Sequence, residues 1–309
     1  MRLNATTAIS TPKVLLVPYS KWHVPRYHEW MKDEEIQQAT ASEPLSLSEE
    51  YAMQQSWRND ADKLTFIICL PVAPERDNGR LSLIDEDDSP ARMIGDINLF
   101  LRVEEDDEHG EGNTSTPQII GEIELMIAVK KDQGRGFGKA ALLAFLTYVL
   151  KREREVLGEF VAGDEDAKRV MGGKVKELKF GALSVKIGQA NERSLRLFEG
   201  LGFRKVGDGP NYFGEWELRR RELDVESEDL RSFSSTIIPP LFVLCSLAIA
   251  FWKHASPFYR DTWEDLPVTS SNIPVHFPFN FLETDIERTK LAVGGAVAVT
   301  DLVAEVKEH

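Results

Sequence analysis

Apolar residues follow two periods along the first two thirds of the chain. Short β-branched runs predict strands at 13–17, 63–70, 92–101, 119–129, 180–187 and 203–206, with 216–218 closing the sheet. Apolar residues at helical spacing predict helices that begin near 21, run from 47 to about 57, from 139 to about 155, and from 191 to 201. The alternation of strands and helices predicts an α/β domain.

Local signals mark the ends of these helices. Ser46 and Glu49 form a capping box ahead of the second helix, because each side chain satisfies a backbone N–H of the first turn. Gly202 follows the last helix, where a left-handed C-cap is expected. Three segments interrupt the pattern: an irregular stretch at 71–90, an acidic hairpin insertion at 104–117 and a charged surface insertion at 158–179.

The character of the chain changes near Asp224, where an acidic polar stretch leads into a linker. We therefore expect a domain at 1–224 and a C-terminal extension at 225–309, whose fold the sequence leaves open. Its apolar segment, 237–252, contains a proline pair, and a helix of this length reaches only about 24 Å, short of the roughly 30 Å of a bilayer core. A membrane span is not favoured over a docked apolar segment or a weakly folded extension.

Composition excludes several classes of function. The 309 residues carry a net charge of −14, and an acidic protein lacks the basic face that nucleic acid binding requires. Cys69 and Cys245 are far apart, and neither they nor the six histidines have the spacing of a metal site, so we expect no disulfide framework and no metal. The first ten residues lack the apolar core of a signal peptide, and we expect a cytoplasmic protein.

A glycine-rich turn joins a strand to the long helix in the stretch Asp132–Leu146, DQGRGFGKAALLAFL. A Walker loop would need serine or threonine where Ala140 stands, and a dinucleotide loop would need glycine where Lys139 stands. The turn still exposes successive backbone N–H groups at a helix N-terminus, where an anion binds. The alternative is an ordinary glycine-rich turn. The candidate anion-binding residues are Gln133, Gly134, Arg135, Gly136, Phe137, Gly138 and Lys139.

The strand before this turn carries two carboxylates, Glu122 and Glu124, in the otherwise apolar run IIGEIELMIAV. Strand alternation places both on one face of the sheet. Because an unpaired charge is costly in a dry site, two carboxylates in a buried strand indicate a chemical role. The alternative is that one or both only hold a substrate ammonium or a nearby arginine.

Two stretches resemble the signatures of the GNAT N-acetyltransferases. Gln133–Gly138 has the pattern Q-x-x-G-x-G of their acyl-coenzyme A pyrophosphate loop, and Asn191–Phe203, NERSLRLFEGLGF, resembles their second signature. The resemblance implies the GNAT fold, a mixed twisted sheet flanked by helices, and acetyl-CoA as co-substrate. It also implies that backbone N–H groups at the end of the strand polarise the thioester carbonyl and that the second signature contacts the coenzyme A arm. The residues that it adds to the coenzyme site are Ile127, Ala128, Asn191, Ser194 and Phe198.

A narrower resemblance covers residues 1–221. The stretches VLLVPYSKWHVPRYHEWMKDEEIQQATASEPLSLSEEYAMQQSWRNDADKLTFI, GDINLFL, GEIELMIA and KIGQANERSLRLFEGLGF are similar to the N-acetyltransferase 9 family, in the ribosomal-protein-alanine N-acetyltransferase-like branch of the fold. The resemblance implies a protein N-acetyltransferase linked to tubulin. The chain departs from the family in its enlarged acidic loops, in the insertion at 158–179 and in the residues after the domain. The resemblance therefore does not identify the surface that binds the acceptor.

Acetyl transfer to an amine requires a base, a polarised carbonyl and a proton for the leaving thiolate. The resemblance aligns Glu122 with the strand glutamate that histone acetyltransferases of this superfamily use as general base, directly or through water, and Glu124 is the second candidate. Many GNAT enzymes place a tyrosine acid where this chain has Phe198, which cannot donate a proton. Tyr27, Tyr148 and water stay open as the acid.

The class of acceptor follows from acid–base chemistry. An α-amine titrates at about 8 and a lysine side chain at about 10.4, so a modest base without a tyrosine acid fits the N-terminal α-amine of a protein. The resemblance implies tubulin as that protein. His23 and His28 on the first helix are further candidates for contacting the acceptor. Two alternatives are a non-catalytic acetyl-CoA-binding protein that associates with microtubules and an acetyltransferase for small amines.

Overall fold

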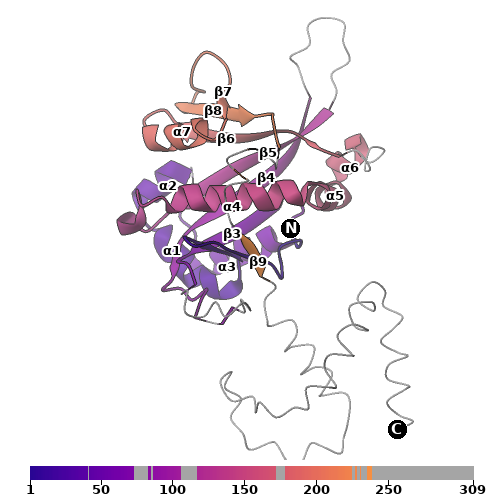
Figure 1. Ribbon diagram of the computed structural model, residues 1–309. Helices are drawn as coiled ribbons and strands as arrows, with labels where there is room; N and C mark the ends of the chain where they lie inside the picture. Colours follow the sequence, from indigo (N-terminus) through magenta and orange to yellow (C-terminus); the bar gives the residue numbers. More distant parts are fainter. Residues whose placement is uncertain are drawn as a thin grey trace, which may run out of the picture. The chain divides into compact units, whose positions relative to one another are not determined.

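The computed structural model describes residues 1–40, 42–72, 83–84, 86–105, 117–171, 178–224, 227, 230 and 235–238. The chain divides into two compact units, Met1–Leu241 and Phe242–His309. The described residues all belong to the first unit, which contains the predicted α/β domain (Figure 1).

One sheet of nine strands runs through this unit in the order β7-β8-β6-β5-β4-β3-β2-β1-β9. The strands are β1 Ala8–Ser10, β2 Leu15–Pro18, β3 Lys63–Cys69, β4 Met93–Glu105, β5 Pro117–Ile127, β6 Phe180–Gly188, β7 Arg204–Lys205, β8 Glu215–Arg220 and β9 Thr236–Ile238. Among these described strands, neighbours pair antiparallel except β5 and β6, which pair parallel. The sheet is therefore mixed, as the sequence predicts.

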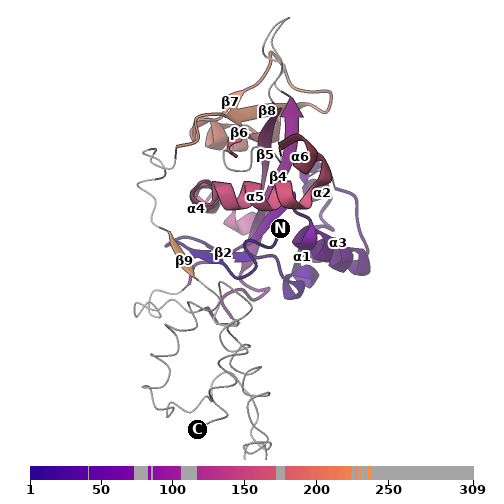
Figure 2. The ribbon, with the colours of Figure 1, turned by 90° about the vertical axis from the view of Figure 1, so that its right-hand side faces the viewer.

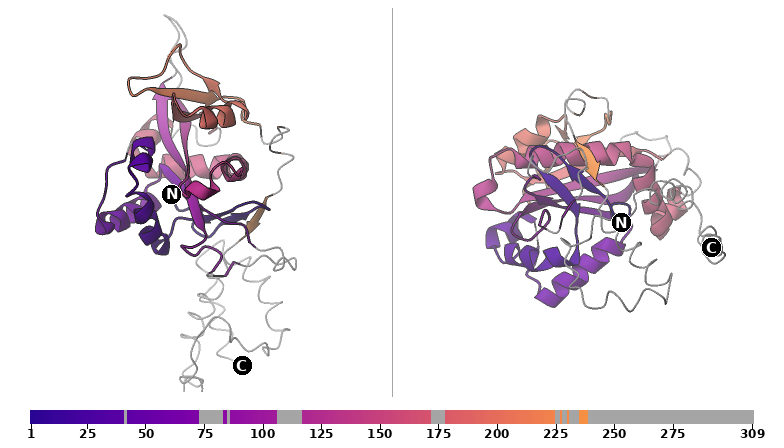
Figure 3. Two further views of the ribbon diagram at one scale, coloured as in Figure 1. Left: turned by 90° about the vertical axis from the view of Figure 1, so that its left-hand side faces the viewer. Right: turned by 60° about the horizontal axis from the view of Figure 1, so that its bottom comes forward.

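Helices cover both faces of the sheet (Figures 2 and 3). They are η1 Lys21–His23, α1 Val24–Trp30, α2 Glu34–Thr40, α3 Leu47–Asn59, η3 Lys130–Asp132, α4 Phe137–Lys151, α5 Glu153–Gly163, α6 Glu165–Met171 and α7 Glu192–Glu199. Helices α4 and α5 pack on one face, and α1 packs on the other with α3 beside it. The helices from α4 to α6 form the crossover that a parallel pair of strands requires.

The predicted helix ends are confirmed by their capping contacts. The backbone N–H of Glu49 donates to Ser46 Oγ at 3.4 Å, and the N–H of Ser46 donates to Glu49 Oε2 at 2.8 Å, which completes the capping box of α3. Helix α7 ends earlier than predicted, at Glu199 with Gly200 as its C-cap, and Gly202 just beyond it has the left-handed φ of +83° expected after a helix end. Helix α4 begins earlier than predicted, at Phe137, because Gly136 adopts a φ of +82° and serves as its N-cap.

The interpretation of 158–179 as a surface insertion is wrong for its described part. Residues up to 171 complete α5 and form α6, and both helices bury apolar side chains. The buried residues in this stretch are Phe160, Val161, Ala167 and Met171. Charged residues on the outer faces of these short helices dilute the apolar signal in the sequence, so the average composition suggests a surface loop.

The two faces of the central strands differ in polarity. Ile97 and Leu99 of β4 and Ile123 of β5 belong to the apolar core beneath α4. The residues between them point to the opposite face, on the side of α1 and α3. On that face Asp96 and Asn98 are buried at 2% and 4% exposure. Buried polar groups need hydrogen-bond partners. Since the other face is apolar, a site that uses charged side chains is expected on this polar face.

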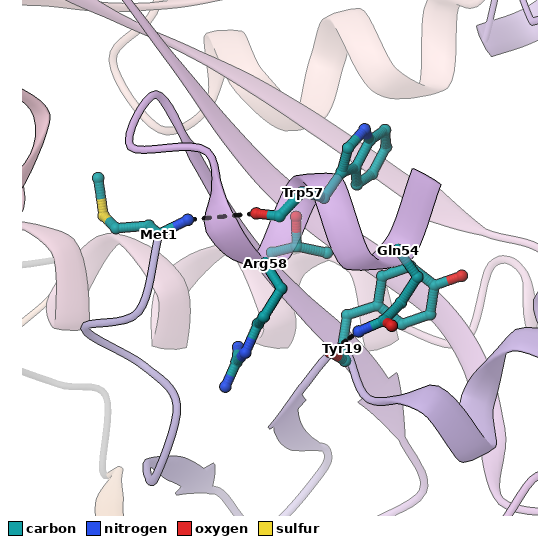
Figure 4. Close-up of a pocket in the computed structure, with 6 residues that line it drawn as sticks. Met1, Tyr19, Gln54, Trp57 and Arg58 are labelled. Atoms are coloured by element: carbon teal, nitrogen blue, oxygen red, sulfur yellow. Dashed lines mark hydrogen bonds between the residues drawn. The ribbon is translucent and has the colours of Figure 1, made fainter. Parts of the chain in front are cut away.

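The start of the chain is anchored beside α3 (Figure 4). The Met1 ammonium donates to the backbone oxygens of Trp57 at 3.2 Å and Lys63 at 2.7 Å, and burial lowers its pKa to about 6. A small cavity beside it is lined by Met1, Tyr19, Gln54, Trp57, Arg58 and Thr65. The cavity is small and lies where α3, β3 and the start of the chain pack together, so we interpret it as a packing feature.

The compact unit extends beyond the boundary expected at Asp224. Strand β9 pairs antiparallel with β1, with Ala8 opposite Ile238 and Ser10 opposite Thr236, and Leu230 is buried at 3% exposure. A three-residue strand next to a proline pair has no readable period, which explains why the sequence did not reveal it. Most of the apolar segment 237–252 lies outside the described residues. No helix among the described residues is long and apolar enough to cross a membrane.

Two truncated proteins test this boundary. A protein ending at Asp224 loses Leu230 and β9, and burying one leucine stabilises a fold by about 1.5–3 kcal/mol. At about 2–4 °C per kcal/mol for a domain of this size, we expect its melting temperature to fall by about 3–12 °C. A protein ending at Leu241 keeps both features and should match the full-length chain in melting temperature and in acetyl transfer. Differential scanning calorimetry measures the difference, and equal melting temperatures for the two truncated proteins would contradict the structural role of β9.

Candidate active site

Strands β5 and β6 pair over only part of their length and then separate. Their parallel register runs from Ile119 opposite Phe180 to Glu122 opposite Ser184. Beyond that point β5 stays paired with β4 as far as Ile127, while β6 stays paired with β8. We call the opening after Glu122 the fork. Within the described residues, the edge of β5 that faces the fork has no strand partner, so its backbone groups are available to a substrate.

Glu122, the first candidate for the base, is the last paired residue before the fork. Its Oε2 accepts a hydrogen bond from Arg102 Nη1 at 2.8 Å and another from Lys186 Nζ at 3.0 Å. These donors come from β4 and β6, so the carboxylate joins the strands on either side of β5. An oxygen already held by two cations is not free to take a proton from a substrate.

A wider ion-pair network continues from this contact. Arg219 of β8 donates to both carboxylate oxygens of Glu104 at 2.7 and 3.0 Å and to Glu217 Oε1 at 2.7 Å. Arg102 lies within 3.9 Å of Glu217. The network therefore spans β4, β5, β6 and β8 at the closed end of the fork and gives Glu122 a positioning role.

Glu124, the second candidate, stands two residues further along the same face, inside the fork. Its side chain is open to solvent, although protein surrounds it on most sides. The pKa of Glu124 is raised to about 7, mainly by desolvation and in addition by the negative charges of Asp96 and Glu122, while Lys186 opposes them. A carboxyl that titrates near neutral pH and is open to solvent has the properties of a general base.

The glycine loop lies at the end of β5 and is built for an anion. Gly134 and Gly136 have φ values of +74° and +82°, which only glycine adopts without strain, and Gly136 leads directly into the N-terminus of α4. A Cβ at Gly136 would lie 3.3 Å from Lys13 Nζ, and a Cβ at Gly134 would collide with the Arg193 guanidinium. The two glycines therefore keep open a cradle that cations border.

Lys13 and Arg193 were missed by sequence reasoning, and they belong to segments far from the loop. Neither of them, nor the exposed Lys139, forms an ion pair within the described part of the chain, so their charges are available to an anion. The predicted cation Arg135 is engaged, since its Nη1 donates to Asp132 Oδ1 at 2.7 Å. The one signal for Arg193 is its place inside the second signature, between Asn191 and Ser194.

The remaining loop residues hold the cradle in shape. Gln133 Nε2 donates to the carbonyl of Ile127 at 2.8 Å and ties the loop to the end of β5. Phe137 is buried, and the Arg135 guanidinium lies 5.2 Å from the centre of its ring. Gly138 allows α4 to approach β5 closely, with Ile127 Cγ1 3.8 Å from where its Cβ would be.

The backbone N–H of Ala128 does not have the freedom that the resemblance implies. It donates to the carbonyl of Ile94 at 2.9 Å, and the N–H of Val129 donates to the same oxygen at 3.3 Å. This double contact closes the end of the β4–β5 pair, so in this structure Ala128 is engaged by the sheet. Ile127 is the last residue of β5 and lies opposite Gly95 in the register.

Helix α7 presents one end to the glycine loop. Asn191 is its N-cap, with Oδ1 accepting from the backbone N–H of Ser194 at 3.1 Å. Asn191 and Ser194 thus flank Arg193, which reaches over Gly134. Phe198 lies deeper, at 3% exposure, with its ring edge-on to Phe203 at 5.1 Å. It packs α7 into the core and leaves little surface for the pantetheine contact expected of it.

The two tyrosines left open as acids both lie in the interior. Tyr148 packs in the core beneath α4, with its ring 5.4 Å from that of Phe66. Tyr27 donates to Asp96 Oδ2 at 3.3 Å, and burial raises its pKa well above the usual value. Neither position offers a proton to the fork, so water is the remaining candidate acid.

Of the two histidines of the first helical segment, His23 is buried and His28 is half-buried. His23 Nδ1 accepts from the N–H of Ser20 at 3.0 Å, and its Nε2 lies 3.1 Å from the carbonyl of Asp88. His28 lies 3.8 Å from Glu50. These contacts give both a structural role. Among the described residues, no group of three or more histidine, cysteine or acidic side chains is arranged to hold a metal ion.

A parallel strand pair that opens beside a carboxyl, with a cation-bordered glycine loop at the end of the first strand, is an anion site next to an acid–base group, as the resemblance implies for an acyl-coenzyme A-dependent transferase. Residues 13–204 match the family model for the acetyltransferase (GNAT) domain. The chain is 40% identical over 220 residues to alpha/beta-tubulin-N-acetyltransferase 9 of Homo sapiens, covering 71% of this chain and 85% of that protein. It is 39% identical over 234 residues to the N-acetyltransferase 9-like protein of Schizosaccharomyces pombe, covering 71% and 97%.

The chain therefore belongs to the GNAT acetyltransferases and, within them, to the N-acetyltransferase 9 family. Both resemblances seen in the sequence are confirmed, as is the GNAT fold. The protein is an acetyl-CoA-dependent N-acetyltransferase.

A substitution in the cradle tests the anion site. Gly136→Asp places a carboxylate where the pyrophosphate of acetyl-CoA would bind, and we expect the dissociation constant to rise about 30-fold or more, equivalent to about 2 kcal/mol. Gly207→Asp is the matched control, because Gly207 has a φ of +76° and a Cβ there meets nothing within 4 Å. Isothermal titration calorimetry with acetyl-CoA measures both, and unchanged affinity in Gly136→Asp would exclude the loop.

Proposed function

We propose that this enzyme acetylates the N-terminal α-amine of a protein and that Glu124 is its general base. The observation that carries the proposal is the position of Glu124 inside the fork, with a pKa raised to about 7. A base of this strength is mostly ionised at physiological pH and still binds a proton readily. We place Glu122, the first candidate from the sequence, second here, because its Oε2 already accepts from Arg102 and Lys186.

The proposed reaction begins when the glycine loop binds the pyrophosphate of acetyl-CoA and the thioester enters the fork. The Glu124 carboxylate takes one proton from the acceptor ammonium. The neutral nitrogen then attacks the thioester carbonyl carbon, so that a C–N bond forms and the C–S bond breaks. Water supplies the proton to the leaving thiolate, because the Tyr27 hydroxyl already donates to Asp96 and Tyr148 is buried in the core.

Acidic groups near the fork favour a positively charged acceptor. Glu215 and Glu217 of β8 face the same side as Glu124, and the charge of Glu215 contributes to raising the pKa of Glu124. An α-amine, which titrates at about 8, needs less help from a base than a lysine side chain at about 10.4. Three relatives that are 37–40% identical are named alpha/beta-tubulin-N-acetyltransferase 9, and we propose tubulin, in the cytoplasm, as the acceptor.

The turn between β7 and β8 supports a polypeptide acceptor over a small amine. Tyr212 and Phe213 are 97% and 81% exposed, with ring centres 5.4 Å apart. Asn211 fixes the turn, since its Oδ1 accepts from the backbone N–H groups of Phe213 at 2.9 Å and Glu215 at 3.0 Å. Two exposed aromatic rings on an ordered turn beside the fork suit the residues that follow an acceptor's N-terminus.

A pair of glutamine variants tests the base. In the wild type, kcat should fall as the pH drops through about 7, because Glu124 becomes protonated. Glu124→Gln should lower kcat about 10²–10⁴-fold at neutral pH and remove this dependence. Glu122→Gln is the matched control two residues away and should keep most of the activity. It removes one negative charge beside Glu124, so the fall of kcat on the acid side, the acid limb, should move to lower pH. Full activity in Glu124→Gln would identify another base.

Substitution of the aromatic turn tests the acceptor class. Tyr212→Ala with Phe213→Ala should raise the KM for a tubulin N-terminal peptide about tenfold and leave the affinity for acetyl-CoA unchanged. Acetylation of a small amine such as spermidine serves as the control and should not respond. An equal loss with both acceptors would contradict a polypeptide subsite, and faster transfer to the small amine would favour the small-amine alternative. Binding of acetyl-CoA without transfer to either would favour the non-catalytic alternative.

A further inference from the structure

Asp96 of β4 is a buried carboxyl that the proposed chemistry does not use. In the β4–β5 register Asn98 lies opposite Glu124 and Asp96 lies opposite Met126. Asp96 and Glu124 therefore share one face of the sheet as diagonal neighbours, a relation that separates residues by about 7–8 Å. Only 2% of Asp96 is exposed, while Glu124 opens to solvent. The two carboxyls are a close pair in two different environments.

The partners of Asp96 are neutral. Its Oδ2 accepts from Asn98 Nδ2 at 2.8 Å and from the Tyr27 hydroxyl of α1 at 3.3 Å. Among the described residues, no lysine, arginine or histidine forms an ion pair with it. The other titratable groups on this side include Tyr19, after β2, Glu50 of α3 and His28 of α1. His28 lies 3.8 Å from Glu50, and in the described part of the chain it forms no ion pair with Asp96. When Asp96 is ionised, its negative charge is therefore not compensated locally.

Asn98 lies between the two carboxyls. It gives its amide nitrogen to Asp96, while its Oδ1 is buried without a hydrogen-bond partner among the described residues. Buried acceptors without a donor are uncommon and costly. The residue opposite Asn98 is Glu124, and the protonated form of that carboxyl would supply the missing donor. The arrangement favours the protonated form of Glu124 by a second route.

Other charges also face Glu124, but solvent or a counter-charge weakens each. Glu122, on the same strand, is paired with two cations, including Lys186 of β6. Glu215 of β8 is half-exposed and accepts from Asn211 Nδ2 at 3.0 Å. Solvent screens exposed charges far more than buried ones. Asp96 is thus the neighbouring negative charge that neither a cation nor water neutralises.

We infer that Asp96 is a positioning residue that keeps Glu124 able to bind a proton near neutral pH, through its uncompensated charge on the adjacent strand and through Asn98. The inference rests on the proposed role of Glu124. Burial raises the pKa of Asp96 itself to about 6. Above that pH Asp96 is ionised and repels the ionised form of Glu124, which delays the loss of the Glu124 proton to higher pH.

The direct test measures the carboxyl of Glu124 by ¹³C NMR in the full chain, with side-chain carboxyls labelled and the Glu124 signal assigned from its loss in Glu124→Gln. In Asp96→Asn, an isosteric change that keeps an acceptor for Tyr27 and Asn98, the pKa of Glu124 should fall by about one pH unit or more. The acid limb of kcat should move to lower pH by the same amount. Glu50→Gln, which neutralises an equally buried carboxyl on α3, is the matched control and should leave the pKa of Glu124 unchanged.

A second neutral substitution covers the case in which Asp96→Asn does not fold. Asp96→Ser removes the same charge with a smaller side chain that still offers an oxygen, and it should also lower the pKa of Glu124. In Glu124→Gln, by contrast, the pKa of Asp96 should stay at about 6, because Glu124 is still mostly protonated at the pH where Asp96 ionises. Unchanged titration of Glu124 in a folded Asp96 variant would overturn the inference. If the pKa of Glu124 falls but the pH dependence of kcat does not move, the coupling is supported and Glu124 is not the base. This outcome separates a failure of the proposed function from a failure of the inference.

Discussion

The partial pairing of β5 is the constraint on which the rest of the site depends. This strand keeps its hydrogen bonds to β4 along its whole length but pairs with β6 only as far as Glu122. Unpaired backbone groups and a carboxyl in the fork therefore lie together beside the helix N-terminus that follows the strand. Because Gln133 ties the glycine loop to the carbonyl of Ile127, the anion cradle is fixed to the same strand as Glu124. One strand thus positions both halves of the reaction.

Environment sorts three carboxyls on one sheet face into different roles. Glu122 is neutralised by Arg102 and Lys186 and holds strands together. Asp96 is buried among neutral donors, and Glu124 is open to solvent with a pKa raised to about 7. Desolvation and neighbouring charge, rather than residue type, decide which carboxyl can act as a base. The ion-pair network of β4, β6 and β8 supports this division, because it fixes Glu122 and keeps Lys186 close to the fork.

The anion cradle depends on side chains that chain folding brings together. Lys13 comes from the start of the chain and Arg193 from α7, and both lie against the glycines of the loop. A Cβ added at either glycine would contact these cations. The cations can therefore lie close to the loop only because the loop residues have no side chains. Arg135 lies within the loop itself, but its guanidinium donates a hydrogen bond to Asp132.

The sequence by itself determined the α/β class, most strand and helix positions, the glycine loop and the pair Glu122 and Glu124, because period, capping residues and glycine placement are local signals. The GNAT and N-acetyltransferase 9 resemblances followed from the same local motifs. The sequence did not determine strand β9, the burial of α5 and α6, or which cations border the cradle. Each of these depends on contacts between segments that are far apart in the chain. The proposal of Glu124 rather than Glu122 as the base also rests on the tertiary structure. Two carboxylates on one strand have the same local sequence signal, and only the strands on either side decide which one receives cations and which one receives a buried negative neighbour.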